Sequence, residues 1–397
     1  MREYITEKYA GLIIFWLTLI FGSVGLVFAQ ATGSSATAVV IAKDTTGGGS
    51  ALDDGPHVFW RSAGSATVFY HCNGQIDKRD FTFRDTLRFR GFCGDSMAEY
   101  VIPVNMIIDE TCIFEDISKI FVISDIHGEY DYLVDILTNS GVIDSRGRWT
   151  WGEGHLVIDG DIFDRGDRVT ECLWFIYRLE QEADRAGGKV HYLLGNHELM
   201  ILRGDKRYVN EKYLEGVVKT IRIRYEDLFS PEMELGRWLR SKPTVIKINE
   251  IIFVHGGLNP VALQFCGTVA GINEIVRRGI DMRSSGVAFN DTVNFMFGSM
   301  GPLWYRGYHY AMEDKYPLIT PDEIVRVLTS FDARTIVVGH SEVDSVTGLF
   351  DNRIMAIDVP LETIGSFQAL LWHDGRFYRV HGDGRRQLLF QPGSYGK

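Results

Sequence analysis

Five short apolar runs, each bounded by polar residues, follow one another through the last two thirds of the chain. They are residues 120–123, 156–158, 192–194, 251–254 and 336–338. Runs of this length without polar alternation are typical of strands that are buried on both faces of a sheet. We therefore predict five buried strands within one large domain.

Apolar residues at helical spacing lie between several of these runs. Residues 130–137 and 169–179 keep this spacing, and each segment is followed closely by glycine. Residues 320–323, Thr-Pro-Asp-Glu, form a capping box with proline at the first helical position. A further helix is expected within residues 230–243. Alternating strands and helices predict an α/β sandwich.

The N-terminal part of the chain has a different pattern. Residues 30–56 are rich in Ala, Thr, Gly and Ser, which predicts a flexible linker. Residues 57–115 contain short strand-like runs, with Asn73-Gly74 as a hairpin signal, and predict a small β accessory module. The main domain is expected to span residues 118–390 and to end with a hairpin.

Residues 10–28 are apolar or small apart from Thr18 and Ser23, and small residues precede Gln30. This pattern predicts that residues 1–29 are a cleaved secretory signal. The run is also about long enough to span a bilayer, so an uncleaved membrane anchor is the alternative. Both interpretations place the body of the protein in the periplasm or another extracytoplasmic compartment, with membrane contact only through this segment.

Charge and cysteine content exclude some classes of function. The formal net charge of −11 argues against a nucleic-acid partner, because phosphate contacts need a basic face. The five cysteines show no CxxC spacing, so we expect neither a structural zinc site nor a redox motif. Cys72 and Cys93 both lie in the accessory module and could form a disulfide in an exported protein.

Each predicted strand leads into side chains that can bind a metal ion. The five blocks are Asp125-Ile126-His127-Gly128, Gly160-Asp161-Ile162-Phe163-Asp164-Arg165-Gly166, Gly195-Asn196-His197-Glu198, His255-Gly256-Gly257 and Gly339-His340-Ser341. The carboxyl ends of strands in an α/β sheet converge on one crevice, so residues far apart in sequence can meet there. One such block occurs often by chance, whereas five in order indicate a site.

The residue types of these blocks favour a dinuclear metal centre. Carboxylate and amide oxygens and imidazole nitrogens suit manganese, iron or zinc. The predicted ligands are Asp125, His127 and Asp161 for one ion, and Asp161, Asn196, His255 and His340 for the other, with Asp161 bridging. Two such ions activate a shared water and stabilise the attacking and leaving oxygens of an in-line displacement. No serine or cysteine nucleophile pattern is found, so we expect direct attack by a metal-bridged hydroxide.

Two further residues of these blocks are candidates for proton transfer. His197 follows a predicted ligand, and we expect it to protonate the leaving-group oxygen as a general acid. Asp164 is expected to bind the other ring nitrogen and fix the tautomer. The alternative is that His197 and Asp164 form a purely structural pair beside the metals.

Two arginines are candidates for phosphate binding. Arg165 is expected to bind two phosphate oxygens with its planar guanidinium, and a structural ion pair with Asp167 or Glu198 is the alternative. Arg306 lies in an aromatic loop and is either a second phosphate ligand or a surface residue.

The segment of residues 203–243 separates the third and fourth blocks and is rich in aromatic residues. Its aromatic side chains are Tyr208, Tyr213, Tyr225, Phe229 and Trp238. They line either a substrate cleft or the core side of inserted helices, and such aromatics more often belong to the core.

The five blocks together resemble the signature set of the calcineurin-like metallophosphoesterases. The Asp-Arg-Gly and Asn-His-Glu forms are similar to the phosphoprotein phosphatase (PPP) branch. Further similarity is to the bacterial Shewanella-like phosphatases within it, over residues 54–58, 196–200, 203–205, 207–208, 212–213 and 301–307. The resemblance covers residues 54–385, and it implies a four-layer α/β/β/α sandwich with two divalent metal ions.

The resemblance implies an enzyme that hydrolyses phosphomonoesters, including phosphotyrosine or phosphoserine/threonine in proteins, without a covalent enzyme intermediate. The Ser-Ala-Pro-Asn-Tyr motif of eukaryotic relatives is absent, which weakens an assignment to Ser/Thr specificity. Two alternatives remain. One is a hydrolase of dinucleoside polyphosphates or other phosphoanhydrides, and the other is a non-catalytic envelope protein that binds a partner on a phosphatase scaffold.

Overall fold

The computed structural model describes residues 53–72, 75–90, 99–105, 111–282, 291–361 and 367–391. The chain divides into two compact units, Met1–Ser35 and Ala36–Lys397, and all described residues lie in the second. Within these ranges no helix is both long and apolar enough to span a membrane. The predicted signal or anchor and residues 30–52 of the predicted linker lie outside the described residues.

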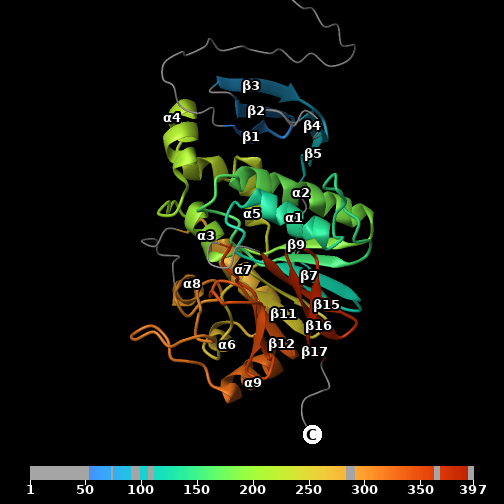
Figure 1. Ribbon diagram of the computed structural model, residues 1–397. Coiled ribbons are helices and arrows are strands. Elements are labelled where there is room, and N and C mark those ends of the chain that lie inside the picture. Colours follow the sequence, from blue (N-terminus) through green and yellow to red (C-terminus); the bar gives the residue numbers. More distant parts are fainter. Residues whose placement is uncertain are drawn as a thin grey trace, which may run out of the picture. The chain divides into compact units, whose positions relative to one another are not determined.

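Two six-stranded sheets form the centre of the described part of the chain (Figure 1). The first has the order β17 (Arg386–Phe390), β16 (Arg376–His381), β15 (Gln368–His373), β7 (Lys119–Ile123), β8 (His155–Ile158) and β9 (Lys189–Tyr192). The second has the order β13 (Thr347–Leu349), β14 (Ile354–Ala356), β12 (Thr335–Val338), β11 (Ile251–Val254), β10 (Val245–Ile248) and β6 (Ile113–Phe114).

Alternation along the central strand β7 explains how the layers pack. Ile120 and Val122 belong to the hydrophobic cluster that the two sheets share. Phe121 and Ile123 point to the opposite face and belong to the cluster formed with α1 and α2. Successive side chains of a strand alternate between its faces, so a strand covered on both sides reads as a continuous apolar run.

Helices cover both outer faces, which completes the predicted four-layer sandwich. The helices α1 (Tyr130–Asn139) and α2 (Val169–Arg185) pack on the first sheet, and α7 (Val269–Gly279) and α9 (Pro321–Ser330) pack on the second. The predicted capping box is present at α9, where the Thr320 hydroxyl accepts from the Glu323 N–H at 3.3 Å. Parallel pairing of β7 with β8 and β8 with β9 brings their carboxyl ends to one edge.

The segment between the third and fourth ligand blocks is less regular than predicted. After α3 (Asn196–Leu202), which carries the third block, it contains the π-helix η1 (Lys212–Val217), α4 (Val218–Ile221), the 3₁₀-helix η2 (Tyr225–Phe229) and α5 (Glu234–Arg240). The helix expected over residues 230–243 is therefore restricted to α5, because Ser230 and Met233 have extended backbones that interrupt it. The short helices α6 (Ala262–Phe265) and α8 (Asp291–Phe297) follow later.

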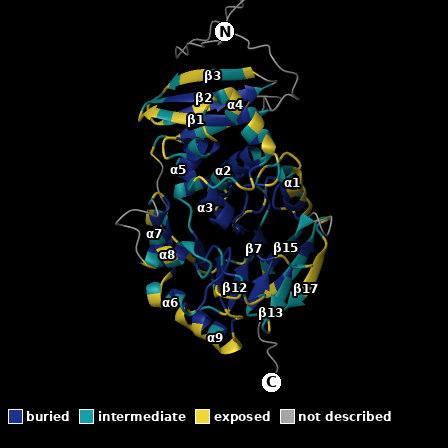
Figure 2. Cartoon of the chain, turned by 90° about the vertical axis from the view of Figure 1, so that its left-hand side faces the viewer, coloured by how far each residue is buried: buried dark blue, intermediate teal, exposed yellow. Residues whose placement is uncertain are grey.

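The predicted β module comprises a three-stranded sheet, β1 (Asp54–Ser62), β2 (Ser65–Cys72) and β3 (Gln75–Thr82), and a hairpin of β4 (Thr86–Arg90) and β5 (Glu99–Pro103). Figure 2 shows the middle strand β2 mostly buried, whereas the residues of the outer strand β3 are intermediate or exposed. Two indole N–H groups attach the module to the helices, from Trp174 of α2 to the Pro56 carbonyl at 2.8 Å and from Trp60 to Glu234 of α5 at 2.7 Å.

The boundaries of this module differ from the predicted residues 57–115. Strand β1 begins at Asp54, within the predicted linker, and β6 pairs in parallel with β10 of the main sheet. Strands β2 and β3 pair with Cys72 opposite Gln75. The two residues of the expected turn, Asn73-Gly74, lie outside the described residues. Cys72 is disulfide-bonded. Cys93 also lies outside the described residues, so the pairing of these two cysteines stays a prediction.

Candidate metal centre

The loops that follow β7, β8 and β12 bend sharply at the predicted ligands. Asp125, His127, Asp161 and His340 all have left-handed backbones, with φ values of 53°, 48°, 58° and 64°. This conformation costs a non-glycine residue about 1–3 kcal/mol, and such strain is concentrated at functional sites. The strained turns direct these four side chains into one buried space.

Close backbone approach explains the glycine that precedes Asp161. Gly160 has a φ of 84°, and a Cβ there would lie 2.6 Å from the Gly195 Cα and 2.8 Å from His255 Nδ1. Only glycine satisfies both constraints. The Asp161 loop can therefore pack directly against the loop that carries Asn196.

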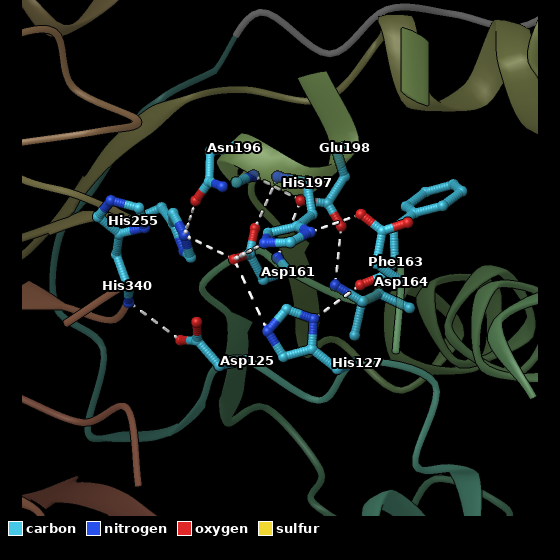
Figure 3. A network of polar contacts seen from close by, with 12 residues as sticks. Asp125, His127, Asp161, Phe163, Asp164, Asn196, His197, Glu198, His255 and His340 are labelled. Atoms are coloured by element: carbon cyan, nitrogen blue, oxygen red, sulfur yellow. Dashed lines mark hydrogen bonds and ion pairs between the residues drawn. The ribbon is translucent and has the colours of Figure 1, made fainter. Parts of the chain in front are cut away.

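The Asp161 carboxylate lies at the centre of the site (Figure 3). Its Oδ2 is 3.1 Å from His255 Nε2, 3.8 Å from His197 Nε2 and 4.0 Å from His127 Nε2. Its Oδ1 accepts a hydrogen bond from the His197 backbone N–H at 3.0 Å. One carboxylate is thus shared by imidazoles that come from three of the five blocks.

Backbone carbonyls orient two of these imidazoles toward Asp161. His127 Nδ1 donates to the Phe163 carbonyl, and His255 Nδ1 donates to the Asp159 carbonyl, both at 2.7 Å. Because a carbonyl only accepts, each Nδ1 carries a hydrogen, which leaves Nε2 as the ring atom that can bind a cation. This arrangement is typical of histidines that bind a metal ion.

Closely spaced donor atoms indicate that a cation fits this site. His255 Nε2 lies 3.0 Å from Asn196 Oδ1 and 3.1 Å from Asp161 Oδ2. Burial would lower the pKa of His255, but Asp161 and Asp125 outweigh it and raise this pKa well above its ordinary value, so a proton on Nε2 joins the three atoms here. A divalent cation would take the place of that proton when it binds. Oxygen and imidazole donors together suit manganese, iron or zinc. The residues present therefore fit the predicted metal ions.

Two groups of donor atoms, each within 4.8 Å, share Asp161. They are His127, Asp161 and His197, and Asp161, His255 and His340. The first group contains His197 where the sequence predicted Asp125. Asp125 Oδ2 accepts from the Ser124 hydroxyl at 2.5 Å and from the His340 N–H at 3.1 Å. Asp125 still lies beside this network in Figure 3, and the assignment of ligands to each ion stays a prediction.

His197 and Asp164 form the predicted pair. His197 Nδ1 lies 2.5 Å from Asp164 Oδ2, both side chains are buried, and Nε2 faces Asp161. Burial alone would lower the pKa of His197, but Asp161 and Asp164 outweigh it and raise this pKa above its ordinary value. The pair is therefore suited to hold a proton on Nε2, which the proposed role as an acid requires.

The electrostatic environment favours opposite protonation behaviour in His127 and Asp161, since it keeps His127 neutral and Asp161 ionised. Burial lowers the pKa of His127 to about 3, which keeps the imidazole neutral. Burial would raise the pKa of Asp161, but His255 and His197 outweigh it and hold this pKa well below its ordinary value. A neutral imidazole beside an ionised carboxylate is the state in which both bind a cation.

The two predicted arginines lie in different surroundings. Arg165 is exposed, and within the described ranges its side chain makes no ion pair, so the alternative partners Asp167 and Glu198 are not used. Its charge contributes to lowering the pKa of His127, which places it near the site. Arg306 is half-buried, and it donates to the His340 carbonyl and, at 3.4 Å, to the Ser341 hydroxyl.

Two buried carboxyl groups near the site were missed by the sequence reasoning. Burial raises the pKa of Asp159 to about 8, and neither of its carboxyl oxygens has a hydrogen-bond partner among the described residues. Burial also raises the pKa of Asp358, with Asp125 adding to the shift. A signal existed for both, because each ends an apolar run as the predicted ligands do. Their position does not reveal which of several carboxyls faces the metals.

Glu198 is a buried acceptor that holds the site together. Its carboxylate accepts from the backbone N–H groups of Asp161, Ile162 and Gly195 at 2.8, 2.8 and 2.7 Å, and from the Tyr192 hydroxyl at 2.9 Å. One side chain thus ties the second ligand block to the third.

Replacing this acceptor is expected to destabilise the fold. The Glu198→Ala variant leaves four buried donors without an acceptor, and each unsatisfied buried group costs about 1–3 kcal/mol. We expect the free energy of unfolding in urea to fall by at least about 3 kcal/mol. Glu153→Ala, at an exposed glutamate, is the control and should change it by less than about 0.5 kcal/mol. An unchanged unfolding midpoint in Glu198→Ala would contradict this role.

Comparisons with known proteins agree with this geometry. Residues 118–344 match the sequence model of the family described as calcineurin-like phosphoesterase. Shewanella-like protein phosphatase 1 of Plasmodium berghei is 30% identical over 255 residues, which cover 63% of this chain and 68% of that protein. Shewanella-like protein phosphatase 2 of Arabidopsis thaliana is 27% identical over 288 residues, covering 62% and 72%.

A solved structure is similar over most of the chain. The cold-active protein-tyrosine phosphatase of a psychrophilic Shewanella species superimposes with a TM-score of 0.76 at 36% sequence identity. The superposition covers 85% of this chain and 99% of that protein. It therefore extends beyond residues 118–344, the part that the family model matches.

Proposed function

Because the chain belongs to the calcineurin-like phosphoesterase family of metal-dependent enzymes, we propose that it is a phosphatase. The proposed enzyme is exported and hydrolyses phosphomonoesters with two divalent metal ions. Phosphorylated tyrosine, serine or threonine in proteins is the proposed substrate class. The observation that carries the proposal is the Asp161 carboxylate, which two groups of donor atoms share beside the His197–Asp164 pair.

The proposed metal site uses Asp161 as the shared ligand. His127 lies on one side of it, and His255 and His340 lie on the other, with Asn196 contributing its amide oxygen. Bound manganese, iron or zinc ions would activate a water for attack on phosphorus and neutralise charge on the phosphate. The oxygen and nitrogen donors do not distinguish among these three metals.

The protein's own groups act on the phosphate and on the leaving group. Arg165 is exposed beside the site and able to bind two phosphate oxygens with its planar guanidinium. When the ester P–O bond breaks, His197 gives the proton on Nε2 to the departing oxygen. Asp164, which accepts from Nδ1 at 2.5 Å, keeps the imidazole in the required tautomer and orientation.

Removing the guanidinium is expected to weaken substrate binding. Arg165→Ala loses charge-assisted hydrogen bonds worth about 1.5–3 kcal/mol, so KM for an aryl phosphate should rise by about 10- to 100-fold. Steady-state kinetics measure this change, and the bound metal should not change. Arg165→Lys keeps the charge but loses the planar, two-pronged guanidinium, so its KM should lie between those of the wild type and Arg165→Ala. An unaltered KM in Arg165→Ala would show that this arginine does not bind phosphate.

The proposed activity is tested with a panel of substrates and metals. Residues 30–397 would be purified and supplied with manganese, iron or zinc. Phosphate release would then be measured from phosphotyrosine and phosphoserine peptides and from a dinucleoside tetraphosphate. We expect hydrolysis of at least one phosphopeptide. Preference for the dinucleotide would favour a phosphoanhydride hydrolase. A folded protein that binds no metal and hydrolyses none of the three would favour a binding protein.

Export is proposed on two observations. Residues 10–28 form an apolar run, and Cys72 is disulfide-bonded, which is typical of oxidising compartments. Fractionation of cells that express the full chain would locate the protein, and we expect it in the periplasmic or membrane fraction. Recovery in the cytoplasmic fraction alone would contradict export.

A further inference from the structure

Tyr208 differs from the other aromatic residues of the segment that separates the third and fourth ligand blocks. Its side chain is 51% exposed, whereas four others are buried in the core, as the more frequent interpretation of such aromatics predicts. These four are Tyr213, Tyr225, Phe229 and Trp238. Tyr208 therefore contributes little to the core, and its ring is available for contact with a ligand.

The ring of Tyr208 lies beside the proposed general acid. The ring centroids of Tyr208 and His197 are 5.5 Å apart, with the planes tilted by 47°. On the outer side, the Arg207 guanidinium lies 5.6 Å from the Tyr208 ring and is itself held by Asp205. The ring thus adjoins the acid on one side and remains open to solvent over about half of its surface.

The backbone of Tyr208 is fixed to the proposed phosphate-binding residue. The Tyr208 carbonyl accepts from the Arg165 N–H at 2.9 Å, and the Asn210 side chain donates to the Arg165 carbonyl at 2.7 Å. These two bonds hold Tyr208 in register with the loop that carries Asp164 and Arg165. The position of the ring is therefore set by the same elements that position the phosphate and the proton.

The leaving group of a phosphate ester must approach His197 Nε2, because Nδ1 is bound to Asp164. Its carbon skeleton must then lie close to the imidazole, where Tyr208 presents an exposed ring. Two aromatic rings in offset or tilted contact attract each other beyond the area that they bury. An aromatic leaving group can make this contact, whereas the short alkyl group of a serine ester offers little surface.

We propose that Tyr208 determines specificity for aryl phosphates, by packing its ring against the aromatic leaving group at His197. This inference rests on the proposed phosphomonoesterase function. It assigns Tyr208 a role in substrate choice and none in the chemical step. Arg207 and the tyrosine hydroxyl are not required for it, because the ring face makes the contact.

Two peptides that are identical except for phosphotyrosine or phosphoserine test this role in the full chain. Tyr208→Ala should lower kcat/KM for the phosphotyrosine peptide by about tenfold, the upper end of what one ring pair contributes. The phosphoserine peptide should lose less than about twofold. Tyr208→Phe keeps the ring and should retain the wild-type ratio. Tyr132→Ala removes a tyrosine that is 40% exposed on α1 and packs on Phe367, and it should change neither value.

The ratio of the two kcat/KM values separates the possible outcomes. An equal loss for both peptides in Tyr208→Ala would show a merely structural role, and unchanged kcat/KM values for both peptides would show no role. Either result overturns the assignment while the wild-type protein still hydrolyses phosphate esters. If the metal-loaded wild-type protein hydrolyses neither peptide, the proposed function itself fails, and this inference fails with it.

Discussion

Asp161→Asn is expected to remove bound metal and to lower kcat/KM by on the order of 10⁴, because bound metal ions supply several kcal/mol of transition-state stabilisation. The carboxylate is shared by both groups of donor atoms, with His127 and His197 on one side and His255 and His340 on the other. An amide keeps the size and the acceptor for the His197 N–H, but it lacks the negative charge that holds two cations. The loss should therefore come from the metals and not from misfolding.

Metal content and kcat/KM of the same preparation test this expectation. Asp167→Asn is a matched control, since Asp167 lies in the same loop but its side chain is exposed. That control should retain both metal and activity. If Asp161→Asn kept the wild-type metal content and turnover, Asp161 would not bridge two ions, and the main support for the proposed mechanism would be lost.

His197→Ala is expected to lower kcat by about 10²- to 10⁴-fold while the metal content remains unchanged. The imidazole would no longer deliver the Nε2 proton to the leaving-group oxygen. The loss should therefore be smallest for an ester such as 4-nitrophenyl phosphate, whose leaving group needs little protonation. Asp164→Asn should act in the same direction and less strongly, because the imidazole remains but loses the negatively charged acceptor at Nδ1.

The same variant distinguishes an acid from a metal ligand. His197 Nε2 lies 3.8 Å from Asp161 Oδ2 and belongs to the first group of donor atoms. Geometry alone thus allows it to bind an ion in place of Asp125. Loss of one ion per chain in His197→Ala would reassign His197 as a ligand, and the proton would then have to come from another group.

The buried strands could be predicted because burial on both faces leaves a continuous apolar run. Strands β7, β8, β11 and β12 lie where residues 120–123, 156–158, 251–254 and 336–338 predicted them. The third run was placed too late, since β9 ends at Tyr192 and the Leu194 N–H bonds to the Pro243 carbonyl outside the strand. An apolar run indicates that a segment is buried, but the end of a strand depends on its hydrogen bonds to the neighbouring strand.

The accessory region also shows that strand pairing cannot be predicted from a local sequence pattern. The two residues of β6 were assigned to the β module, but they pair in parallel with β10 in the main sheet. No local pattern marks a two-residue strand, because its position depends on a partner more than a hundred residues away. The α/β sandwich itself was predictable, since it follows from the order of strands and helices.

The candidate site was largely predictable because its residues lie at the ends of strands. His127, Asp161, Asn196, His255 and His340 come together as the parallel topology requires. The role of Glu198 was missed, because a sequence does not show that four buried donors meet one carboxylate. The exposure of Tyr208 could not be predicted either, because its position in the sequence resembles that of the buried aromatic residues of the same segment.

Counting bound metal per chain decides whether these residues hold two divalent ions and use them for phosphate hydrolysis. The measurement is elemental mass spectrometry of the purified protein, with phosphatase activity recorded on the same sample before and after chelation. We expect two ions per chain, and we expect chelation to abolish the activity and added manganese, iron or zinc to restore it. A folded protein that binds no ion, or that hydrolyses phosphate esters equally well after complete chelation, would contradict this expectation.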